Sequence, residues 1–375
     1  MDKKRNSIAL ITTHNTNNYG ASLQCYATIR ELKQYGDVSV INYDNRHIGS
    51  SMDLLRFSLS LRGIRSLAKD LLRILPRRVA IERFQTFAKH NFNLTNKFKE
   101  AELSGIKLNY DYYISGSDQI WNPYCISKAG KFDPNYFLEF APETSVCASY
   151  ASSWGGFQIT PNHYQTLKGY LKKYKYISVR ERQMCEELAD LSECSIKSVC
   201  DPTLLLSKDE WIRVARHSTA TFGFEDYLLV YSVPKNPIIK NVVLKIAERL
   251  KLQIVVLDQD PLFNIKGSEK IANAGPLEFV KLFQDASYVV TDSFHGTCFS
   301  TIFNKPFHVV AEAPHSSRIE SFLNEIGLTS RLIANPDSLQ NCTYSLDYGS
   351  ANHQIDIIRH NSKQFIAQIF KHANN

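Results

Sequence analysis

A histidine and two small polar residues follow a short apolar run near residue 290. The run is Tyr288 to Val290, and Asp292, Ser293 and His295 come directly after it, where a helical pattern begins. An apolar run of this kind indicates a buried parallel strand, so the polar residues lie at its carboxyl end beside a helix N-terminus. Ligands bind at that end of open α/β sheets, and a helix start favours anions. We expect His295 to move a proton near neutral pH. The alternative is that Asp292 and Ser293 cap the helix and His295 is an ordinary loop residue.

A second polar turn lies near the beginning of the chain. The segment 7–13 has the pattern of a buried strand, a turn rich in Asn and Gly follows, and a helix is predicted from Ala21. In such a βαβ unit, Asn18, Tyr19 and Gly20 would present backbone N–H groups to an anion or a sugar. Ordinary turn chemistry explains these residues equally well. The turn lacks GxGxxG, so no dinucleotide is predicted.

Two further strand ends carry residues that could bind a substrate. Asp118 and Gln119 follow a predicted strand, which suits them to hydrogen-bond sugar hydroxyls, and Trp121 offers a face for stacking. Asp118 could equally form a turn or cap a helix. Arg180 stands at a predicted helix start, which the helix dipole disfavours unless the arginine serves an anion.

The alternation of strands and helices predicts an α/β protein with two domains. A chain of 375 residues is too long for one small core. We expect residues 1–206 to form one Rossmann-like domain and residues 207–375 a second, ending in an amphipathic helix over about 351–372. The predicted strands are 7–13, 38–43, 110–115, 146–152, 176–179, 227–233, 253–257, 288–290 and 307–311.

Composition excludes several classes of protein. No apolar stretch approaches the roughly 20 residues of a membrane span, and no secretory signal is recognisable, so we expect a cytoplasmic protein. The eight cysteines form neither a CxxC pair nor a Cys/His cluster at zinc spacing, so reduced thiols and no metal site are predicted.

The net charge of +7 is concentrated in residues 54–90, which we expect to be a helical insertion in the first domain. One interpretation is a solvated helical face. The other is contact with an anionic lipid surface or with an acceptor that carries phosphate. No nucleic-acid-binding motif accompanies the cations, so nucleic acid is not an expected partner. The nine cations are Arg56, Arg62, Arg65, Lys69, Arg73, Arg77, Arg78, Arg83 and Lys89.

Four segments together resemble the polysaccharide pyruvyl transferase family. They are Asn18–Gln24 (NYGASLQ), Gly116–Pro123 (GSDQIWNP), Ser178–Glu181 (SVRE) and the segment around His295. They occur in the same order as in that family, over about residues 8–331. The resemblance implies two Rossmann-like domains facing a central cleft, a GT-B-like architecture.

The resemblance also implies an activity. Enzymes of this family transfer the pyruvyl group of phosphoenolpyruvate to two hydroxyls of a sugar, forming a cyclic ketal. The substrate would be a cell-surface polysaccharide or exopolysaccharide, or its lipid-linked precursor. Phosphoenolpyruvate is then a co-substrate, and neither a cofactor nor a metal is implied. The expected sites are the acceptor in the first domain and the donor in the second.

Residue by residue, His295 matches the family's histidine and Arg180 the arginine of the SVRE segment, which would grip the phosphate or carboxylate. Many members have an arginine where this chain has Ser293, so the missing charge would come from Lys305 or Arg318.

Two other functions stay open from the sequence. One is a GT-B glycosyltransferase that uses a sugar nucleotide, for which Glu312 could bind the ribose. The other is a non-catalytic glycan- or lipid-binding protein on the same scaffold.

Overall fold

The computed structural model describes residues 5–57, 60–311 and 317–371. The chain divides into two compact units. The first comprises Met1–Met52, Ala88–Leu205 and Asp356–Asn375, and the second comprises Asp53–Phe87 and Leu206–Ile355. The chain enters the main part of the second unit at Leu206, next to the boundary expected from the sequence.

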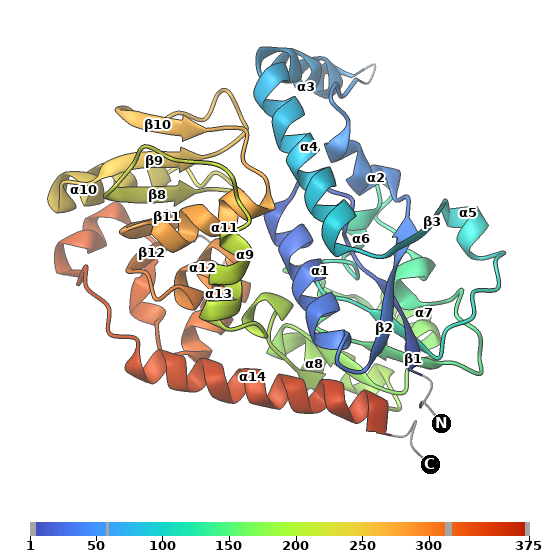
Figure 1. The fold of residues 1–375 in the computed structure, drawn as a ribbon. Coiled ribbons are helices and arrows are strands. Elements are labelled where there is room, and N and C mark those ends of the chain that lie inside the picture. The colour runs from blue at the N-terminus through green and yellow to red at the C-terminus, as the bar shows by residue number, and fades with distance from the viewer. Residues whose placement is uncertain (1–4, 58–59, 312–316, 372–375) are drawn as a thin grey trace. The chain divides into compact units, whose positions relative to one another are not determined.

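The core of the first unit is a parallel sheet of five strands, seen with its helices in Figure 1. A short parallel pair extends this sheet, because the Ser149 N–H donates to the Tyr176 carbonyl at 2.9 Å. In spatial order the five strands are β3 (Leu94–Phe98), β2 (Gly36–Tyr43), β1 (Asn6–Ile11), β4 (Tyr112–Ser115) and β5 (Val146–Ser149), and the pair is β6 (Ile177–Val179) with β7 (Ile196–Ser198).

Both faces of this sheet are covered, as its apolar strands require. On one face, Ala9 and Ile11 join an aromatic core around Trp121 and Trp154, whereas Ile8 and Leu10 point to the opposite face. The helical segments of this unit are α1 (Tyr19–Leu32), α2 (Arg46–Gly49), η1 (Ser50–Met52), α5 (Glu100–Leu103), α6 (Pro123–Ile126), η2 (Pro134–Phe137), α7 (Pro161–Leu171), α8 (Arg182–Leu188), η3 (Ala189–Leu191) and η4 (Pro202–Leu204).

The second unit contains a parallel sheet of six strands. Helix α10 covers one face with aliphatic side chains, and α9, α11 and α12 cover the other with aromatic ones such as Phe279 and Phe299, whose centroids lie 5.2 Å apart. In spatial order the strands are β10 (Ser268–Ile271), β9 (Gln253–Leu257), β8 (Tyr227–Tyr231), β11 (Tyr288–Thr291), β12 (Phe307–Val310) and β13 (Leu332–Ile333). The helical segments are α3 (Leu61–Leu72), α9 (Lys208–Ala215), α10 (Ile239–Leu250), α11 (Pro276–Asp285), α12 (Phe294–Ile302), α13 (Ser317–Glu325), η5 (Thr329–Arg331) and η6 (Pro336–Asn341).

Two segments belong to units other than those the sequence predicted. The basic segment, expected as an insertion in the first domain, belongs over residues 53–87 to the second unit. Ion pairs explain this assignment, because Lys69 contacts Asp260 at 2.9 Å and Arg83 contacts Glu278 at 3.9 Å. Helix α4 (Ile74–Asn91) carries the chain back to the first unit.

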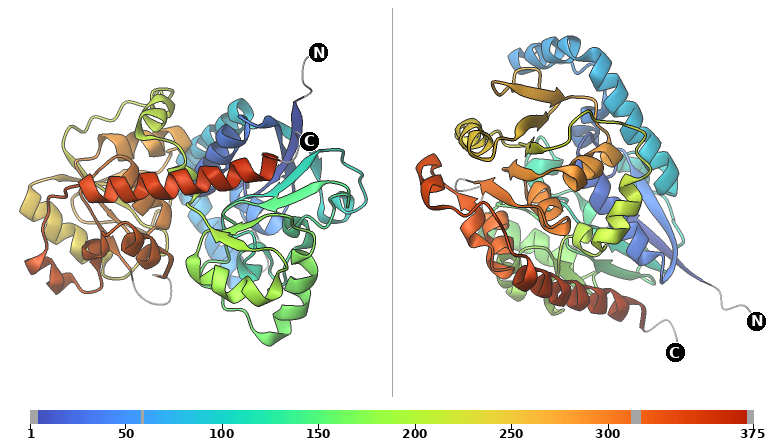
Figure 2. Two further views of the ribbon diagram at one scale, coloured as in Figure 1. Left: turned by 90° about the horizontal axis from the view of Figure 1, so that it is seen from below. Right: turned by 60° about the vertical axis from the view of Figure 1, so that its left-hand side comes forward.

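The predicted C-terminal helix is present as α14 (Gly349–Phe370), one continuous helix in Figure 2. From Asp356 onward it belongs to the first unit rather than the second. Two contacts hold it there. The Phe370 ring stacks on Tyr35 at 4.6 Å, and the Ser362 hydroxyl accepts a hydrogen bond from the Cys200 N–H at 2.9 Å.

Candidate functional site

Three of the four segments singled out in the sequence meet along the carboxyl edge of the first unit's sheet, and the segment Asn18–Gln24 does so through Gln24, which bonds to the end of β1. The residue Thr13 follows β1, Asp118 follows β4, and Arg180 follows β6. Hydrogen bonds connect the strand ends: the Thr13 hydroxyl donates to Asp118 at 2.7 Å, and the Ser153 N–H donates to the Asp118 carbonyl at 3.1 Å. We call Thr13, Asp118, Ser153, Arg180, Glu181 and Asp201 the first-unit edge.

Asp118 has a left-handed backbone conformation that is unusual for a non-glycine residue. Its φ is +75°, a region that costs a non-glycine residue about 1–3 kcal/mol. The carboxylate accepts hydrogen bonds from Thr13 and from the Gln119 N–H at 2.8 Å, and the residue is partly exposed. Helix α6 is capped by Asn122 instead, whose side chain accepts from the Tyr124 N–H at 3.1 Å. Asp118 is therefore not the cap of that helix.

Arg180 is buried in a cluster of the protein's own acceptors. Its Nη1 donates to Asp201 at 3.0 Å, its Nε to Glu181 at 3.2 Å, and its Nη2 to the Ser153 hydroxyl at 3.0 Å. Burial alone would lower the pKa of Arg180, but Glu181 and Asp201 outweigh it and raise the pKa. Three nitrogens of the guanidinium are thus committed within the protein. Its grip on phosphate or carboxylate stays a prediction.

The first-unit edge is acidic as a whole, because Asp118, Glu181 and Asp201 surround the single guanidinium of Arg180. Carboxylates accept hydrogen bonds from hydroxyl groups and repel phosphate. The edge therefore suits a sugar better than an anion.

The other predicted acceptor residues differ in what they can contact. Asn18 is exposed and caps α1 by accepting from the Ala21 N–H at 3.2 Å, while Tyr19 and Gly20 are buried in the first turn. Gln119 is partly exposed, and its Oε1 accepts from Asn122 at 2.9 Å.

Trp121 is not available for stacking on a sugar. The side chain is 0% exposed, its Nε1 donates to the Tyr136 carbonyl at 3.1 Å, and its ring stacks on Phe137 at 4.8 Å. Its apolar ring packs in the core of the first unit instead.

Sequence reasoning did not select several residues that build this edge. Gln24 is buried, and its amide donates to the Thr12 hydroxyl at 2.9 Å and to the Thr13 carbonyl at 3.3 Å, which fixes the end of β1. Asp201 was recognisable only as an aspartate before a proline after a short strand. Its pairing with Arg180, 21 residues away in sequence, is a tertiary contact.

The fourth segment forms the carboxyl edge of the second unit's sheet. His295 lies in the first turn of α12 and is half-buried, and Ser293 is the N-cap, accepting from the Gly296 N–H at 3.4 Å. Asp292 holds the loop after β8: it accepts from the Ser232 hydroxyl at 2.6 Å and from the Val233 N–H at 2.7 Å. Burial raises the pKa of Asp292. We call Lys235, Asp292, Ser293, His295 and Arg318 the second-unit edge.

Of the two cations proposed to replace the missing arginine, one lies at the carboxyl edge of the sheet and the other at the amino edge. Arg318 lies in the first turn of α13, and its guanidinium carbon lies 5.9 Å from the ring centroid of Phe294, next to His295. Lys305 follows the far end of α12 and precedes β12, so it lies at the opposite, amino edge of the sheet and does not belong to the site. Glu312 lies outside the described residues.

Lys235 is a further cation at the second-unit edge that sequence reasoning did not select. It lies in the loop after β8, pairs with Asp258, and its Nζ lies 4.3 Å from the centroid of the Phe263 ring. The N–H of the next residue, Asn236, donates to Asp292 at 3.1 Å, so Lys235 lies near the start of α12.

Many cations of the basic segment share carboxylates inside the second unit. Asp70 is buried and accepts from Arg56 at 2.8 Å and from Arg73 at 3.0 Å, with Arg77 at 3.7 Å. Burial would raise the pKa of Asp70, but these hydrogen bonds outweigh it and lower the pKa to about 2. Most of these cations are thus engaged with carboxylates.

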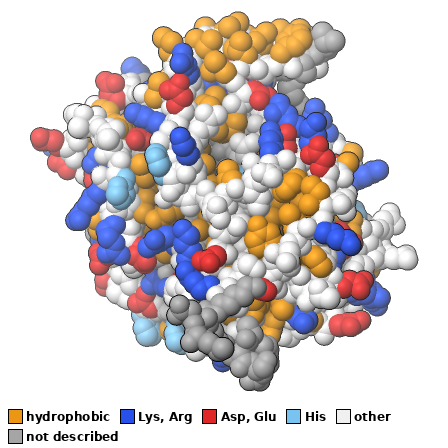
Figure 3. Space-filling view, turned by 45° about the vertical axis from the view of Figure 1, so that its right-hand side comes forward, with side chains coloured by type: hydrophobic (Ala, Val, Ile, Leu, Met, Phe, Trp, Pro, Cys, Tyr) orange, Lys and Arg blue, Asp and Glu red, His pale blue; other side chains and the backbone are white. Residues whose placement is uncertain are grey.

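Large apolar side chains are exposed on the same segment. Seven of the fifteen exposed large hydrophobic side chains among the described residues fall in residues 54–75, with 36% to 74% of each exposed. They form the hydrophobic area over α3 at the top of Figure 3. We call this set the α3 apolar surface: Leu54, Leu55, Phe57, Ile64, Leu71, Leu72 and Leu75.

Within residues 5–57, 60–311 and 317–371, no group of three His, Cys, Asp or Glu side chains could hold a metal ion. No described helix is long and apolar enough to cross a membrane.

Comparison with known proteins gives both a family and a fold. The polysaccharide pyruvyl transferase model matches residues 18–314. A search of curated proteins found no match.

Solved structures that resemble this chain include three UDP-N-acetylglucosamine 2-epimerases. One is 13% identical, covers 99% of this chain and 96% of its own, and has a TM-score of 0.54. The Methanocaldococcus jannaschii enzyme in complex with UDP-GlcNAc and UDP is 14% identical over 94% and 99% of the two chains, with a TM-score of 0.53. The Rickettsia bellii enzyme is 9% identical over 99% and 98%, with a TM-score of 0.51. At these identities the likeness concerns the GT-B-like fold alone.

Proposed function

This chain belongs to the polysaccharide pyruvyl transferase family, and from that premise we propose that it transfers the pyruvyl group of phosphoenolpyruvate to two hydroxyls of a sugar. The product is a cyclic ketal on a cell-surface polysaccharide or its lipid-linked precursor. The methylene carbon of phosphoenolpyruvate takes a proton and becomes a methyl group. Two C–O bonds form at C2, the C2–O bond to phosphate breaks, and the second hydroxyl proton leaves with the phosphate.

The observation that carries the proposal is the position of His295 at the start of α12, on the carboxyl edge of the second unit's sheet. The N–H groups and the dipole of a helix start favour an anion, and phosphoenolpyruvate carries both a phosphate and a carboxylate. Arg318 adds positive charge near this helix start, and Lys235 lies there too, paired with Asp258. A histidine here protonates the methylene carbon or the departing phosphate, a contribution of about 10²–10⁴-fold.

On the acceptor side, we assign the sugar to the first-unit edge, because its carboxylates suit hydroxyl groups. Asp118 is partly exposed and fixed by Thr13, so it accepts the hydrogen of an attacking hydroxyl. Arg180 then acts mainly as a positioning residue that holds Glu181 and Asp201. This role differs from the direct anion contact expected from the sequence.

The α3 apolar surface adds a partner to the proposal: the anionic inner face of a membrane, reached from the cytoplasm. Residues 54–78 contain six cations whose side chains are described, and these pair with only three carboxylates, Asp70, Glu82 and Asp260. Positive charge therefore remains in excess around the apolar side chains. Exposed aliphatic side chains with surplus cations suit an anionic lipid surface. Such contact would bring the enzyme to a lipid-linked acceptor.

The test is to incubate the purified protein with phosphoenolpyruvate and a panel of synthetic and lipid-linked glycosides. We expect phosphate release coupled to a pyruvyl mass gain on one acceptor. Thermal unfolding adds a donor test, since a ligand at a hundredfold excess over its Kd stabilises the native state by about 2.7 kcal/mol. Phosphoenolpyruvate should raise the Tm, and UDP-GlcNAc should not.

Two other outcomes of this test correspond to the alternative functions. Protection by a sugar nucleotide, with none by phosphoenolpyruvate, would assign the chain to glycosyl transfer. Binding of a glycan without turnover of either donor would assign it a non-catalytic role.

A further inference from the structure

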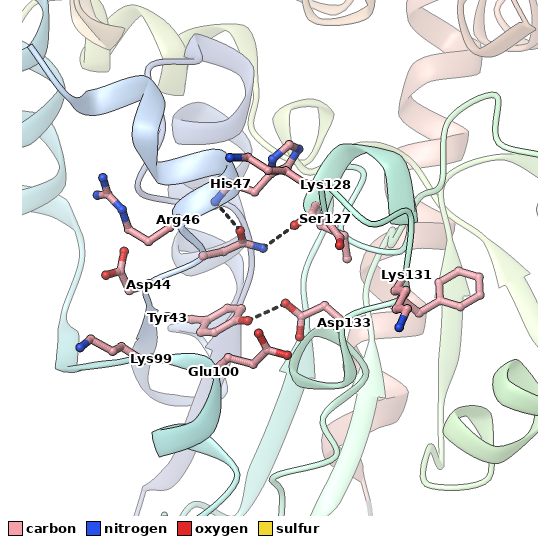
Figure 4. A pocket seen from close by; sticks show the side chains of 13 residues that line it. Tyr43, Asp44, Arg46, His47, Lys99, Glu100, Ser127, Lys128, Lys131 and Asp133 are labelled. Atoms are coloured by element: carbon pink, nitrogen blue, oxygen red, sulfur yellow. Dashed lines mark hydrogen bonds between the residues drawn. The ribbon is translucent and has the colours of Figure 1, made fainter. Parts of the chain in front are cut away.

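A pocket lies in the first unit, beside the carboxyl ends of β2 and β3 (Figure 4). Its volume of about 470 Å³ lies within the range of sites that hold small ligands. None of the residues predicted from the sequence lines it. Its walls come from the ends of β2 and β3, from the end of α6 and from the loop before η2: Tyr43, Asp44, Asn45, Arg46, His47, Lys99, Glu100, Ile126, Ser127, Lys128, Lys131, Phe132 and Asp133.

The polar groups in the wall of the pocket are held by the protein itself. The Tyr43 hydroxyl donates to Asp133 at 2.6 Å, and the other carboxylate oxygen accepts from the Asn135 N–H at 2.9 Å. Asn45 accepts from the His47 N–H at 3.0 Å and donates to the Ile126 carbonyl at 2.9 Å. Figure 4 shows the Tyr43 and Asp133 side chains pointing toward one another. A site whose polar groups are already oriented loses little entropy on binding.

The charges of the pocket favour an anion. Arg46, Lys99, Lys128 and Lys131 are all exposed, and His47 lies beside them. The pocket also contains three carboxylates. Asp44 is already paired with Lys97 at 3.0 Å, which leaves Glu100 and the buried Asp133 to offset the cations. The pocket therefore has more cations than carboxylates.

The remaining lining residues favour a sugar over a simple anion. Asp133, Glu100 and Asn45 offer acceptors for hydroxyl groups, and Tyr43 and Phe132 offer ring surface for the C–H face of a sugar. Inorganic phosphate would contact neither the ring surfaces nor these hydrogen-bond acceptors, and a neutral sugar would leave the surplus cations without a counter-charge.

A short rigid connection links the pocket to the first-unit edge. Gln119 is bonded to Asn122, Asn122 caps α6, and Ile126 at the other end of α6 lines the pocket. A helix of four residues is about 6 Å long, roughly the length of one sugar unit. The pocket and the first-unit edge therefore belong to the same unit and are joined through α6.

We propose that this pocket binds a negatively charged sugar unit, a uronate or a sugar phosphate, next to the unit that is pyruvylated. That this glycan is the acceptor rests on the proposed function; that the pocket binds an anionic saccharide does not.

The test measures binding by titration calorimetry without phosphoenolpyruvate, so its outcome is independent of pyruvyl transfer. The probes are a disaccharide containing glucuronic acid, its neutral glucose counterpart, and glucose 1-phosphate. We expect the anionic probes to bind about tenfold or more tightly than the neutral disaccharide. Preference for the glucuronyl probe assigns a carboxylate to the ligand, and preference for the phosphate assigns a phosphoryl group.

Variants locate the site. Lys128→Gln with Lys131→Gln should weaken the anionic probes about tenfold. Lys168→Gln with Lys172→Gln, an equal charge change at exposed positions in and after α7, should leave the affinity unchanged. Equal affinity for anionic and neutral probes would overturn the proposal. So would an absence of binding by all three, or an equal loss in both double variants.

Discussion

The substitution Gly296→Ala tests how closely α12 must approach β11. A Cβ atom at Gly296 would lie 2.2 Å from the Thr291 Oγ1 and 3.0 Å from its Cβ, whereas ordinary contacts begin near 3.4 Å. Thr291 cannot easily move, because it is 0% exposed and its hydroxyl donates to the Tyr231 carbonyl at 2.6 Å. The same hydroxyl accepts from the Ser293 N–H at 3.1 Å. The start of α12 must therefore shift by about 1 Å to admit the methyl group.

Two effects of this shift can be measured. Overpacking costs about 1–3 kcal/mol, and the higher helix propensity of alanine returns at most about 1 kcal/mol. We therefore expect the free energy of unfolding to fall by about 1–2 kcal/mol. Because His295 moves with the helix start, kcat/KM for phosphoenolpyruvate should fall about 100-fold, the effect of a 1 Å misplacement.

Urea unfolding and steady-state kinetics measure the two effects on one preparation. Gly169→Ala is the matched control, because a Cβ at Gly169 in α7 meets nothing within 4 Å. There we expect stabilisation of about 0.4–1 kcal/mol and unchanged kinetics. Adding Thr291→Ala to Gly296→Ala removes the clashing hydroxyl, so the double variant should lose less stability than the sum of the single variants. Native stability and native kcat/KM in Gly296→Ala would refute the reasoning.

Three further predictions concern other parts of the molecule. Burial raises the pKa of Asp133 to about 6, so its ionisation favours the unfolded chain. The free energy of unfolding should therefore fall by up to about 3 kcal/mol as the pH rises from 4 to 6. In Asp133→Asn, urea unfolding should show a smaller change over this pH range. Arg180→Ala should lower the free energy of unfolding by about 3–5 kcal/mol, because it leaves the buried Asp201 and the partly buried Glu181 without their cation. Arg180→Lys should lower it nearly as much, because an ammonium lacks the guanidinium fork; native urea stability in the lysine variant would show that one charge suffices. Leu72→Ser with Leu75→Ser should reduce co-sedimentation with anionic liposomes about tenfold while Leu244→Ser does not; equal recovery with neutral and anionic liposomes would leave only a solvated face.

The central strands of both sheets could be predicted from the sequence because they are buried on both faces. β8, β9 and β11 consist almost entirely of apolar residues, and the predicted ranges agree within two residues. The strands β3, β7, β10 and β13 were missed. All four lie at the ends of their sheets or in the short pair. The exposed residues of β3, β7 and β10 are mostly polar, and β13 has only two residues, so no apolar run of strand length marks any of them.

The site was less predictable than the fold, because its decisive contacts are tertiary. Because Asp118 and Arg180 each follow a predicted strand, the sequence correctly indicated that both lie at one edge of the sheet. It did not reveal that Asp201 forms an ion pair with Arg180. Lys305 is close to His295 in sequence, but the nine residues of α12 carry it to the opposite edge of the sheet. Trp121 follows a polar turn, yet its large apolar ring is used in the core.

Single-turnover transfer by His295→Gln tests the central claim most directly. Glutamine keeps hydrogen bonding and approximate size but cannot exchange a proton. With excess enzyme, labelled phosphoenolpyruvate and an active acceptor, we expect the variant to bind the donor within a few fold of the wild type. Its transfer rate should be lower by about 10²–10⁴-fold, with an unchanged Tm. A folded, donor-binding His295→Gln protein that forms the ketal at the wild-type rate would contradict the assignment of His295 as the acid.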